Sequence, residues 1–485
     1  MKTKETQGRR EFRLYSLVLT LAVLLAVVVF NVALGALAEA EGWYFYTAPQ
    51  YAHEANGLPD NYFGDTQDKS VSILFCAEEE ALTADSVSNL VWQTAAQFAR
   101  KYTFINVKTV NIYLDPQEVE PYRPVYDAEG TLQEMKDISK ESVIFVCGER
   151  HIVLSLSDFF FLDSQRYITA YNGEEAMAQG IRYVLHDVRP VAAFTVGHGE
   201  TIAPAYASLL AYAGYDVRTV DLATEELHPL TEIVVCMQPL YDFEQAAEGS
   251  GLRTEMERIE DFLADGGSLQ LFLDPYAGRL EKVDALLASF GLSAGEAVLR
   301  ADNQSAVSID GYTFMPDFAD NTLATAVKNK TDAATDARLV VKDAGVVTVG
   351  TPTKDATVYP LLTANATPYR EGEPVGEEDN LCLAARAELS GENGGSVLLV
   401  NGIYLTAGDV LESDGRANRD FFYAYLEETE AQRSPLGATT LVFESTLLED
   451  LTLGEANRYA RILVLWFPLV LLLCGTVILV RRRRR

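Results

Sequence analysis

The chain has 485 residues, of which 70 are Asp or Glu and 39 are Lys or Arg, so its formal net charge at pH 7 is −31. A surface of that sign repels phosphate backbones and anionic headgroups, which excludes nucleic acid as the expected partner. Apolar residues make up 48% of the chain, which is enough for the cores of two or three domains.

A long apolar span follows a basic N-terminus. Residues 1–13 contain five Lys or Arg side chains, and Leu14–Leu37 is dominated by Leu, Val and Ala. About twenty apolar residues cross a bilayer as a helix, and short basic flanks stay in the cytoplasm. We predict a transmembrane helix at 14–37 with residues 1–13 in the cytoplasm. A cleaved signal peptide ending near Ala36-Leu37-Ala38 is the alternative, although this span is longer than an ordinary signal-peptide core.

The other end of the chain repeats the pattern in reverse. Ile462–Val480 is equally apolar and runs directly into Arg481–Arg485. This predicts a second transmembrane helix at 462–480 and a cytoplasmic tail at 481–485. With both ends inside, we expect a protein of the cell membrane whose body, from about Glu39 to Arg461, is extracytoplasmic.

The stretch 65–188 has the pattern of a small α/β domain. Short apolar, strand-like runs flank a segment with apolar residues at helical spacing, and two further runs alternate around a Gly-containing turn. The sequence predicts a β-α-β unit, then a hairpin, then a helix. The elements are strand Val71–Cys76, helix Asp85–Tyr102, strand Phe104–Leu114, hairpin Ser142–Cys147 with Ile152–Leu156, and helix Gly173–Val188.

A more regular alternation of strands and helices fills 189–430. Such alternation favours a parallel sheet covered on both faces, a flavodoxin-like arrangement. Residues 295–380 interrupt it with an irregular, β-containing insertion, after which 381–430 returns to the sheet. The predicted elements are strands Val191–Val196, Tyr215–Leu222, Ile233–Cys236, Ser268–Leu273 and Ser396–Val400, and helices from Pro204, Thr254–Ala264, Leu280–Phe290 and Asn418–Thr429.

Five cysteines are spread along the chain without metal-ligand or redox spacing. Four lie in or at the end of strand-like apolar runs, so we expect small buried side chains, with a disulfide among them as the alternative in an oxidising compartment. The fifth lies in the second predicted membrane span. They are Cys76, Cys147, Cys236, Cys382 and Cys474.

Motifs spread over most of the body resemble the gliding-motility-type auxiliary components of ABC transporters, the GldG-like family. The most specific is a Gly-His-Gly-Glu turn between a strand and a helix, and the others occur in the family's order. They are Val110-Asn-Ile-Tyr-Leu-Asp115-Pro116 with Tyr122, Gly148-Glu-Arg150, Leu156-Ser-Asp158, Tyr171-Asn-Gly-Glu174, Ala193-Phe-Thr-Val-Gly-His-Gly-Glu200, Gly214-Tyr-Asp-Val217, Leu263-Ala-Asp-Gly266-Gly267, Asp274-Pro275, Tyr359-Pro-Leu-Leu-Thr363 and Asn418-Arg-Asp-Phe421.

The resemblance implies a membrane-anchored extracytoplasmic subunit that works beside an ATPase and an integral-membrane permease. It also implies that the second domain is similar in fold to class I glutamine amidotransferases. The hydrolytic machinery of that fold needs a Cys or Ser between glycines on a sharp turn. The candidate, Cys236, has no flanking glycines, so we expect a core residue there.

Other catalytic patterns are also missing from the sequence. The five histidines include no metal-binding pair with a Glu between them, and no EF-hand or phosphate loop occurs. We therefore predict no cofactor, no metal site and no enzymatic activity, with ATP hydrolysis supplied by the partner.

One set of polar residues is predicted to come together. Ligands of parallel sheets bind at the carboxyl ends of the strands, where glycines let the backbone approach closely. We expect a binding edge for a ligand or partner there, although His198 and Glu200 serving only to stabilise their turn is the alternative. The residues at these ends are Gly197, His198, Gly199, Glu200, Gln238, Asp274 and Asn401.

Three functions follow as hypotheses. The first is a non-enzymatic auxiliary subunit of an ABC transport system that couples to a permease or presents cargo to it. The second is an anchored envelope hydrolase or transferase that uses the polar cluster at the carboxyl edge of the sheet. The third is a structural or sensory surface protein.

Overall fold

The computed structural model describes residues 58–462, except 65, 67–68, 127–131, 163–167, 187–188, 244–252, 303, 392–393, 414, 431–437, 439 and 443–452. The described residues fall in one compact unit. The predicted spans 14–37 and 462–480, with 1–13 and 481–485, lie outside them apart from Ile462. Within this part of the chain, no helix combines the length and the apolar character needed to cross a bilayer.

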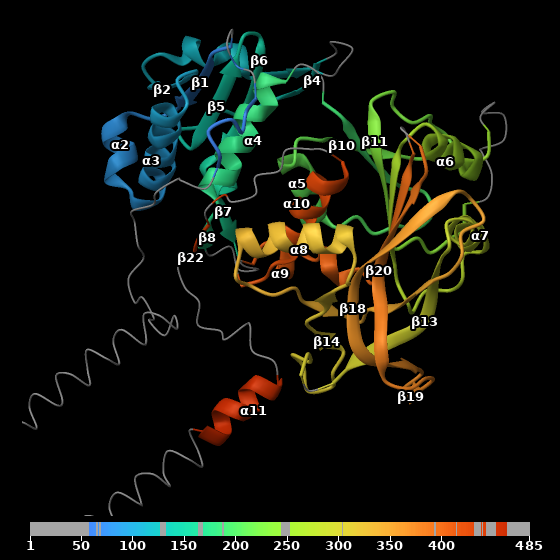
Figure 1. The fold of residues 1–485 in the computed structure, drawn as a ribbon. Coiled ribbons are helices and arrows are strands. Elements are labelled where there is room, and N and C mark those ends of the chain that lie inside the picture. Colours follow the sequence, from blue (N-terminus) through green and yellow to red (C-terminus); the bar gives the residue numbers. More distant parts are fainter. Residues whose placement is uncertain are drawn as a thin grey trace, which may run out of the picture. The chain divides into compact units, whose positions relative to one another are not determined.

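The first domain is built on a four-stranded mixed sheet, which confirms the predicted β-α-β unit and hairpin (Figure 1). The edge strand β2 pairs parallel with β1, and β5 and β6 form the hairpin, turning at Gly148 with φ +63°. Helices α3 and α4 supply buried apolar side chains to the same core. The elements are β1 (Val71–Phe75), α2 (Glu79–Ala84), α3 (Ser86–Lys101), β2 (Ile105–Thr109), β5 (Ser142–Cys147), β6 (Arg150–Ser155) and α4 (Gly173–Leu185).

Segments outside the predicted bounds also belong to this domain. Leu58, Tyr62 and Phe63, which precede residue 65, are buried in its core. A strand from the far end of the chain, β22, pairs antiparallel with β8. The predicted strand 104–114 ends at Thr109, because Oδ1 of Asn111 accepts the backbone N–H groups of Tyr113 and Leu114 in a turn. The small strands are β3 (Pro124–Tyr126), β4 (Leu132–Met135), β7 (Phe160–Leu162), β8 (Ile168–Tyr171) and β22 (Leu441–Val442).

The second domain contains the predicted parallel sheet. Five parallel strands lie in the order β10-β9-β11-β12-β21, and the pairing of β11 with β9 shifts its register between Thr231 and Ile233. They are β10 (Asp216–Val220), β9 (Val191–Thr195), β11 (Thr231–Met237), β12 (Ser268–Leu273) and β21 (Ser396–Asn401). The four strands inside this edge, β9, β11, β12 and β21, are almost wholly buried because helices cover both faces of the sheet, whereas the edge strand β10 carries exposed polar residues.

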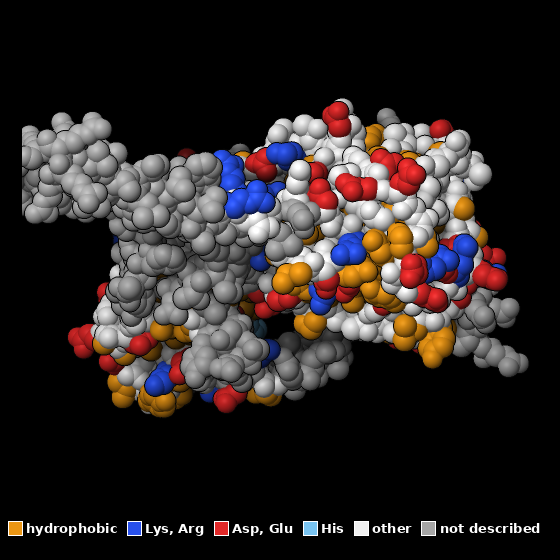
Figure 2. All heavy atoms as spheres, turned by 90° about the horizontal axis from the view of Figure 1, so that it is seen from below, with side chains coloured by type: hydrophobic (Ala, Val, Ile, Leu, Met, Phe, Trp, Pro, Cys, Tyr) orange, Lys and Arg blue, Asp and Glu red, His pale blue; other side chains and the backbone are white. Residues whose placement is uncertain are grey.

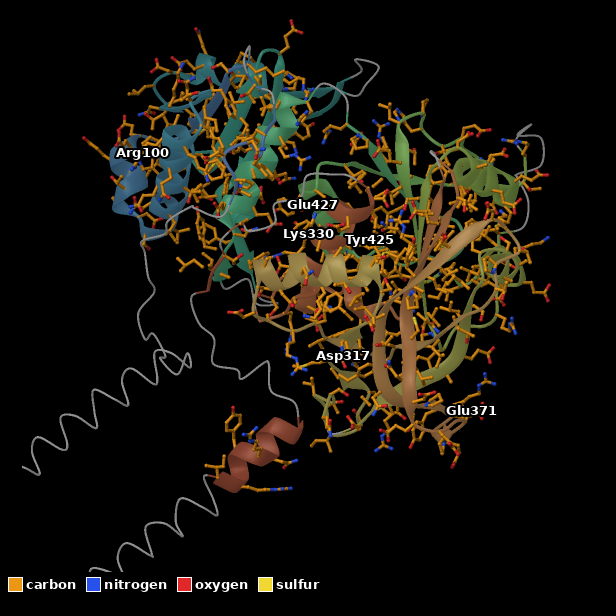
Figure 3. The ribbon with its side chains drawn as sticks, viewed as in Figure 1. Arg100, Asp317, Lys330, Glu371, Tyr425 and Glu427 are labelled. Atoms are coloured by element: carbon orange, nitrogen blue, oxygen red, sulfur yellow. The ribbon has the colours of Figure 1, made fainter. Side chains whose placement is uncertain are left out.

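Alternate residues of each parallel strand point to opposite faces. In β11, Ile233 and Val235 face a core shared with α5 (Pro204–Tyr212), α8 (Thr322–Ala334) and α10 (Asn418–Thr429). Val234 and Cys236 face the other core, with α6 (Glu255–Ala264) and α7 (Glu281–Ser289). On the first side, Lys330 of α8 bonds Glu427 and Glu428 of α10 at 3.1 and 2.8 Å, which ties these two helices together (Figure 3).

The segment 295–380 is more regular than expected. Long antiparallel strands extend the parallel sheet beyond β21 in the order β20-β18-β13-β17. Strand β18 was not predicted because it contains Pro360, Pro368 and Asn365, residues that disfavour strands. In the structure, Pro360 lies next to shifts in the pairing register with β20, where a ladder donor is not needed. The segment therefore contains strands, as predicted, but β13, β17 and β18 continue the main sheet instead of forming a separate irregular insertion.

The remaining elements of this segment and of the C-terminal part include three long strands, β13, β18 and β20, and several short elements. They are β13 (Leu292–Ala301), β14 (Thr313–Phe314), β15 (Asp317–Phe318), β16 (Val341–Lys342), β17 (Gly345–Val349), β18 (Ala356–Arg370), β19 (Glu373–Pro374), β20 (Asp379–Leu389), α9 (Gly408–Leu411) and α11 (Leu453–Arg461).

Candidate functional site

The parallel strands place all seven predicted site residues at one edge of the sheet. Gly197–Glu200 follow β9, Gln238 follows β11, Asp274 follows β12, and Asn401 is the last residue of β21. Because these strands run in the same direction, their carboxyl ends lie side by side. We call the loops that follow these ends the carboxyl edge. Helix α5 begins at Pro204, four residues after Glu200.

His198 lies between two buried carboxylates. Its Nδ1 is 3.1 Å from Oε1 of Glu200, and its Nε2 is 3.0 Å from Oε2 of Glu255. The backbone N–H of His198 also donates to Oε2 of Glu200 at 2.7 Å. The ring packs against Phe243, with centroids 4.2 Å apart. We call these three residues, Glu200, His198 and Glu255, the Glu-His-Glu cluster.

The two carboxylates favour a doubly protonated imidazole. Burial alone would lower the pKa of His198, but the hydrogen bonds and negative charges of Glu200 and Glu255 outweigh it and raise that pKa. Burial works against ionisation of Glu200, yet hydrogen bonds from His198 and from backbone N–H groups lower its pKa. The two carboxylates therefore favour the charged imidazole, the form in which both ring nitrogens donate.

The glycines beside His198 fit the turn that the cluster requires. Gly197 and Gly199 have φ of +112° and +78°, a region that side chains other than glycine rarely adopt. A Cβ atom at Gly199 would also lie 3.1 Å from the side chain of Leu240. The carbonyl of His198 accepts the backbone N–H groups of Leu240 and Tyr241, so this turn is bonded to the loop after β11.

Gln238 and Asp274 form a second, separate group. The side-chain amide of Gln238 donates to Oδ2 of Asp274 at 2.7 Å. Gln238 has a left-handed backbone with φ +51°, a conformation that costs about 1 kcal/mol for a side-chain residue. The strained position brings its amide onto the neighbouring strand end.

The side chain of Asn401 bonds to neighbouring strands of the sheet instead of pointing to the solvent. Its Nδ2 donates to the carbonyls of Gly295 in β13 and Val346 in β17, at 2.8 and 2.9 Å. The side chain is 1% exposed. Asn401 and Asp274 also line a cavity of about 40 Å³, room for a few water molecules only.

Sequence reasoning missed Glu255. The capping box of Thr254 and Glu257 marks the start of α6, and an acidic residue in a first turn is ordinarily explained by the helix dipole. Nothing in the sequence links Glu255 to a histidine that lies 57 positions earlier. Packing of α6 against the sheet makes the contact.

Cys236, the cysteine considered as a nucleophile in the sequence, lies inside the core of the second domain. Cys236 is fully buried in β11, and burial raises the pKa of its thiol to about 12. This confirms it as a core residue. Of the other described cysteines, Cys76 is buried and Cys147 and Cys382 are half-buried; all four are free. In the described part of the chain, no group of three or more His, Cys, Asp or Glu has the arrangement of a metal site.

Beyond the bonded polar groups, the carboxyl edge exposes large apolar side chains. Leu240 and Tyr241 follow β11, Tyr276 follows β12, and Ile403 follows β21. Tyr241 and Tyr276 are 67% and 68% exposed. We call these four residues the apolar rim. Seen from below the view of Figure 1, hydrophobic side chains gather on the second domain among charged ones (Figure 2).

No known protein family matches the chain, and no curated protein resembles it in sequence. Among solved structures, the mmIFT52 N-terminal domain aligns with a TM-score of 0.35 and 12% identity, covering 49% of this chain and 97% of that domain. PurLQS from Thermotoga maritima aligns with a TM-score of 0.28 and 12% identity, covering 50% of this chain and 99% of that one.

A glutamine amidotransferase from Thermotoga maritima is also among the structural matches. It aligns with a TM-score of 0.25 and 16% identity, covering 51% of this chain and 89% of that one. At TM-scores below 0.5, these likenesses are too distant to assign an activity.

Proposed function

We propose that this protein is a membrane-anchored, extracytoplasmic auxiliary subunit of an ABC transport system that acts by contact with a permease rather than by catalysis. The observation that carries the proposal is the contrast between bonded polar side chains and exposed apolar side chains at the carboxyl edge. Each polar side chain described above makes at least one hydrogen bond to another side chain or to the backbone, whereas the exposed large side chains form the apolar rim.

Two sequence features agree with this proposal. The apolar spans at 14–37 and 462–480, with their basic flanks, predict anchors at both ends and an external body. The motifs shared with GldG-like proteins point to the same class of subunit. Exposed Tyr side chains are typical anchors of protein interfaces, because they bury a large area at low entropic cost.

In this proposal the apolar rim contacts the extracytoplasmic loops of the permease. With a formal charge of −31 on the chain, we expect those loops to be neutral or basic, since like charges oppose docking. An anchored hydrolase or transferase would instead need a reactive group at this edge. The only cysteine in β11 is buried with a raised pKa.

Copurification tests the proposal directly. The full chain is expressed together with each ABC permease and ATPase pair of its own genome and extracted in a mild detergent. We expect the permease to copurify, and the double variant Tyr241→Ala, Tyr276→Ala to reduce its recovery about tenfold, because central aromatic anchors carry much of the binding energy.

The matched control is Tyr113→Ala. Tyr113 is 77% exposed but belongs to the first domain, away from the carboxyl edge. We expect it to leave recovery of the permease unchanged, and all variants to melt at the temperature of the wild type. A chain that purifies alone would refute the auxiliary role, and equal losses from Tyr113→Ala and the double variant would refute the apolar rim as the contact.

A further inference from the structure

A cavity of about 220 Å³ lies where the first domain meets helices of the second. Phe160 and Phe161 of β7 and Glu175 of α4 line it from one side, and Tyr212 of α5 and Tyr423 of α10 from the other. Small-molecule sites of proteins occur preferentially at such domain boundaries. A cavity of about 150 Å³ accepts benzene, so this one can hold a ligand of that size with a polar group attached.

The polar side chains of this cavity are mostly acidic. Asp158, Glu175 and Glu412 line it together with one cation, Arg419. Arg419 is already engaged: its Nη1 is 3.8 Å from Oε2 of Glu175, and its Nη2 donates to Thr440. Three carboxyl groups against one guanidinium leave an excess of negative charge when all are ionised.

The carboxyl groups are incompletely compensated. Burial raises the pKa of Glu175, although the charge of Arg419 and the hydroxyl of Tyr423, which donates a hydrogen bond to it, act in the opposite direction. Burial also raises the pKa of Glu412. A cation placed in the cavity would favour the ionised form of both groups.

An acceptor in the same cavity has no partner. Asn172, just before α4, is 3% exposed and lines the cavity. Its Oδ1 is buried and accepts no hydrogen bond from any described residue. A buried acceptor left unpaired costs about 1–3 kcal/mol, so a donor supplied by a ligand would remove that cost.

From the aromatic walls, the excess of carboxyl groups and the unpaired acceptor together, we propose that this cavity binds a small organic cation, a primary amine on an apolar body. The ammonium group donates to Oδ1 of Asn172 and to the carboxylate of Glu175, and the apolar body packs against Phe160, Phe161 and Tyr212. Aromatic faces add attraction for the positive charge. The proposal does not depend on the transport role, so each can fail without the other.

Calorimetric titration of the full chain in mild detergent tests this, with benzylamine as the probe. Benzyl alcohol and benzoate have nearly the same shape with neutral and negative polar groups, and titration into detergent alone is subtracted. We expect benzylamine to bind at least tenfold more tightly than either. Equal binding of benzylamine and benzyl alcohol, or no heat up to millimolar probe, would refute the proposal, and tighter binding of benzoate would make Arg419 the anchor instead.

Two variants locate the site. Asn172→Ala removes the unpaired acceptor and should weaken benzylamine binding about tenfold, while Glu412→Gln removes a charge at the exposed mouth and should weaken it about threefold. Glu371→Gln, at the turn between β18 and β19 far from the cavity, is the matched control and should change nothing (Figure 3). If Asn172→Ala fails to fold, Glu412→Gln decides, and unchanged affinity in that variant contradicts the proposal.

Discussion

Replacement of His198 by Ala is expected to lower the free energy of unfolding by about 3–5 kcal/mol, because it leaves Glu200 and Glu255 buried without their shared partner. Chemical denaturation of the purified chain measures this difference. A loss below about 1 kcal/mol would show that the Glu-His-Glu cluster is not an ion-paired unit.

The His198→Ala effect should also depend on pH. The raised pKa of His198 gives stability that is complete below its ordinary value of 6.5 and is lost as pH rises through the folded value. The lowered pKa of Glu200 gives stability that is complete above 4.5 and is lost as pH falls. The difference between wild type and variant should therefore be largest between these two values.

A second substitution separates charge from packing. Adding Glu200→Gln and Glu255→Gln to His198→Ala removes the uncompensated carboxylates, so we expect the triple variant to be more stable than His198→Ala alone. A triple variant that is less stable would mean that the ring of His198 acts mainly by packing against Phe243.

Replacement of Asn401 by Asp should lower the free energy of unfolding by about 3 kcal/mol, although it changes one atom. Nδ2 of Asn401 donates to two backbone carbonyls, and an Asp would point a second acceptor at both. The destabilisation should grow as pH rises, since a buried carboxyl group resists ionisation and its pKa is raised in the folded chain.

Asn365→Asp is the matched control for this change. Asn365 is exposed in β18 and bonds Glu378 at 2.8 Å, so its substitution should cost less than about 1 kcal/mol. Thermal and denaturant unfolding between pH 4 and pH 8 distinguish the two sites. Equal losses at both positions would contradict the role assigned to Asn401.

Local patterns in the sequence were sufficient for the parallel sheet and for its edge. Buried apolar runs such as Val191–Thr195 and Ser268–Leu273, separated by helices with clear ends, allow few other arrangements. Since all such strands point one way, the shared edge of Glu200, Gln238, Asp274 and Asn401 followed from topology alone.

The contacts at that edge depend on packing over long sequence separations. Glu255 reaches His198 only because α6 packs against the sheet. Asn401 donates to carbonyls of β13 and β17, two strands that the sequence pattern did not predict. The cavity beside Asn172 likewise combines residues from 158 to 423. No local sequence pattern predicts contacts between residues so far apart. Strand β18 was missed for a different reason, because its prolines argue against a strand.

The pairing of β22 with β8 has a consequence for how this protein folds during synthesis. Leu441 and Val442 complete a small sheet whose other strands emerge from the ribosome some 270 residues earlier. The first domain cannot complete this sheet until the second domain has been synthesised. In sequence terms, the second domain is therefore inserted into the first. A chain truncated near residue 430 would contain the second domain, but strand β8 of the first domain would lack its partner β22 and leave a strand edge unpaired.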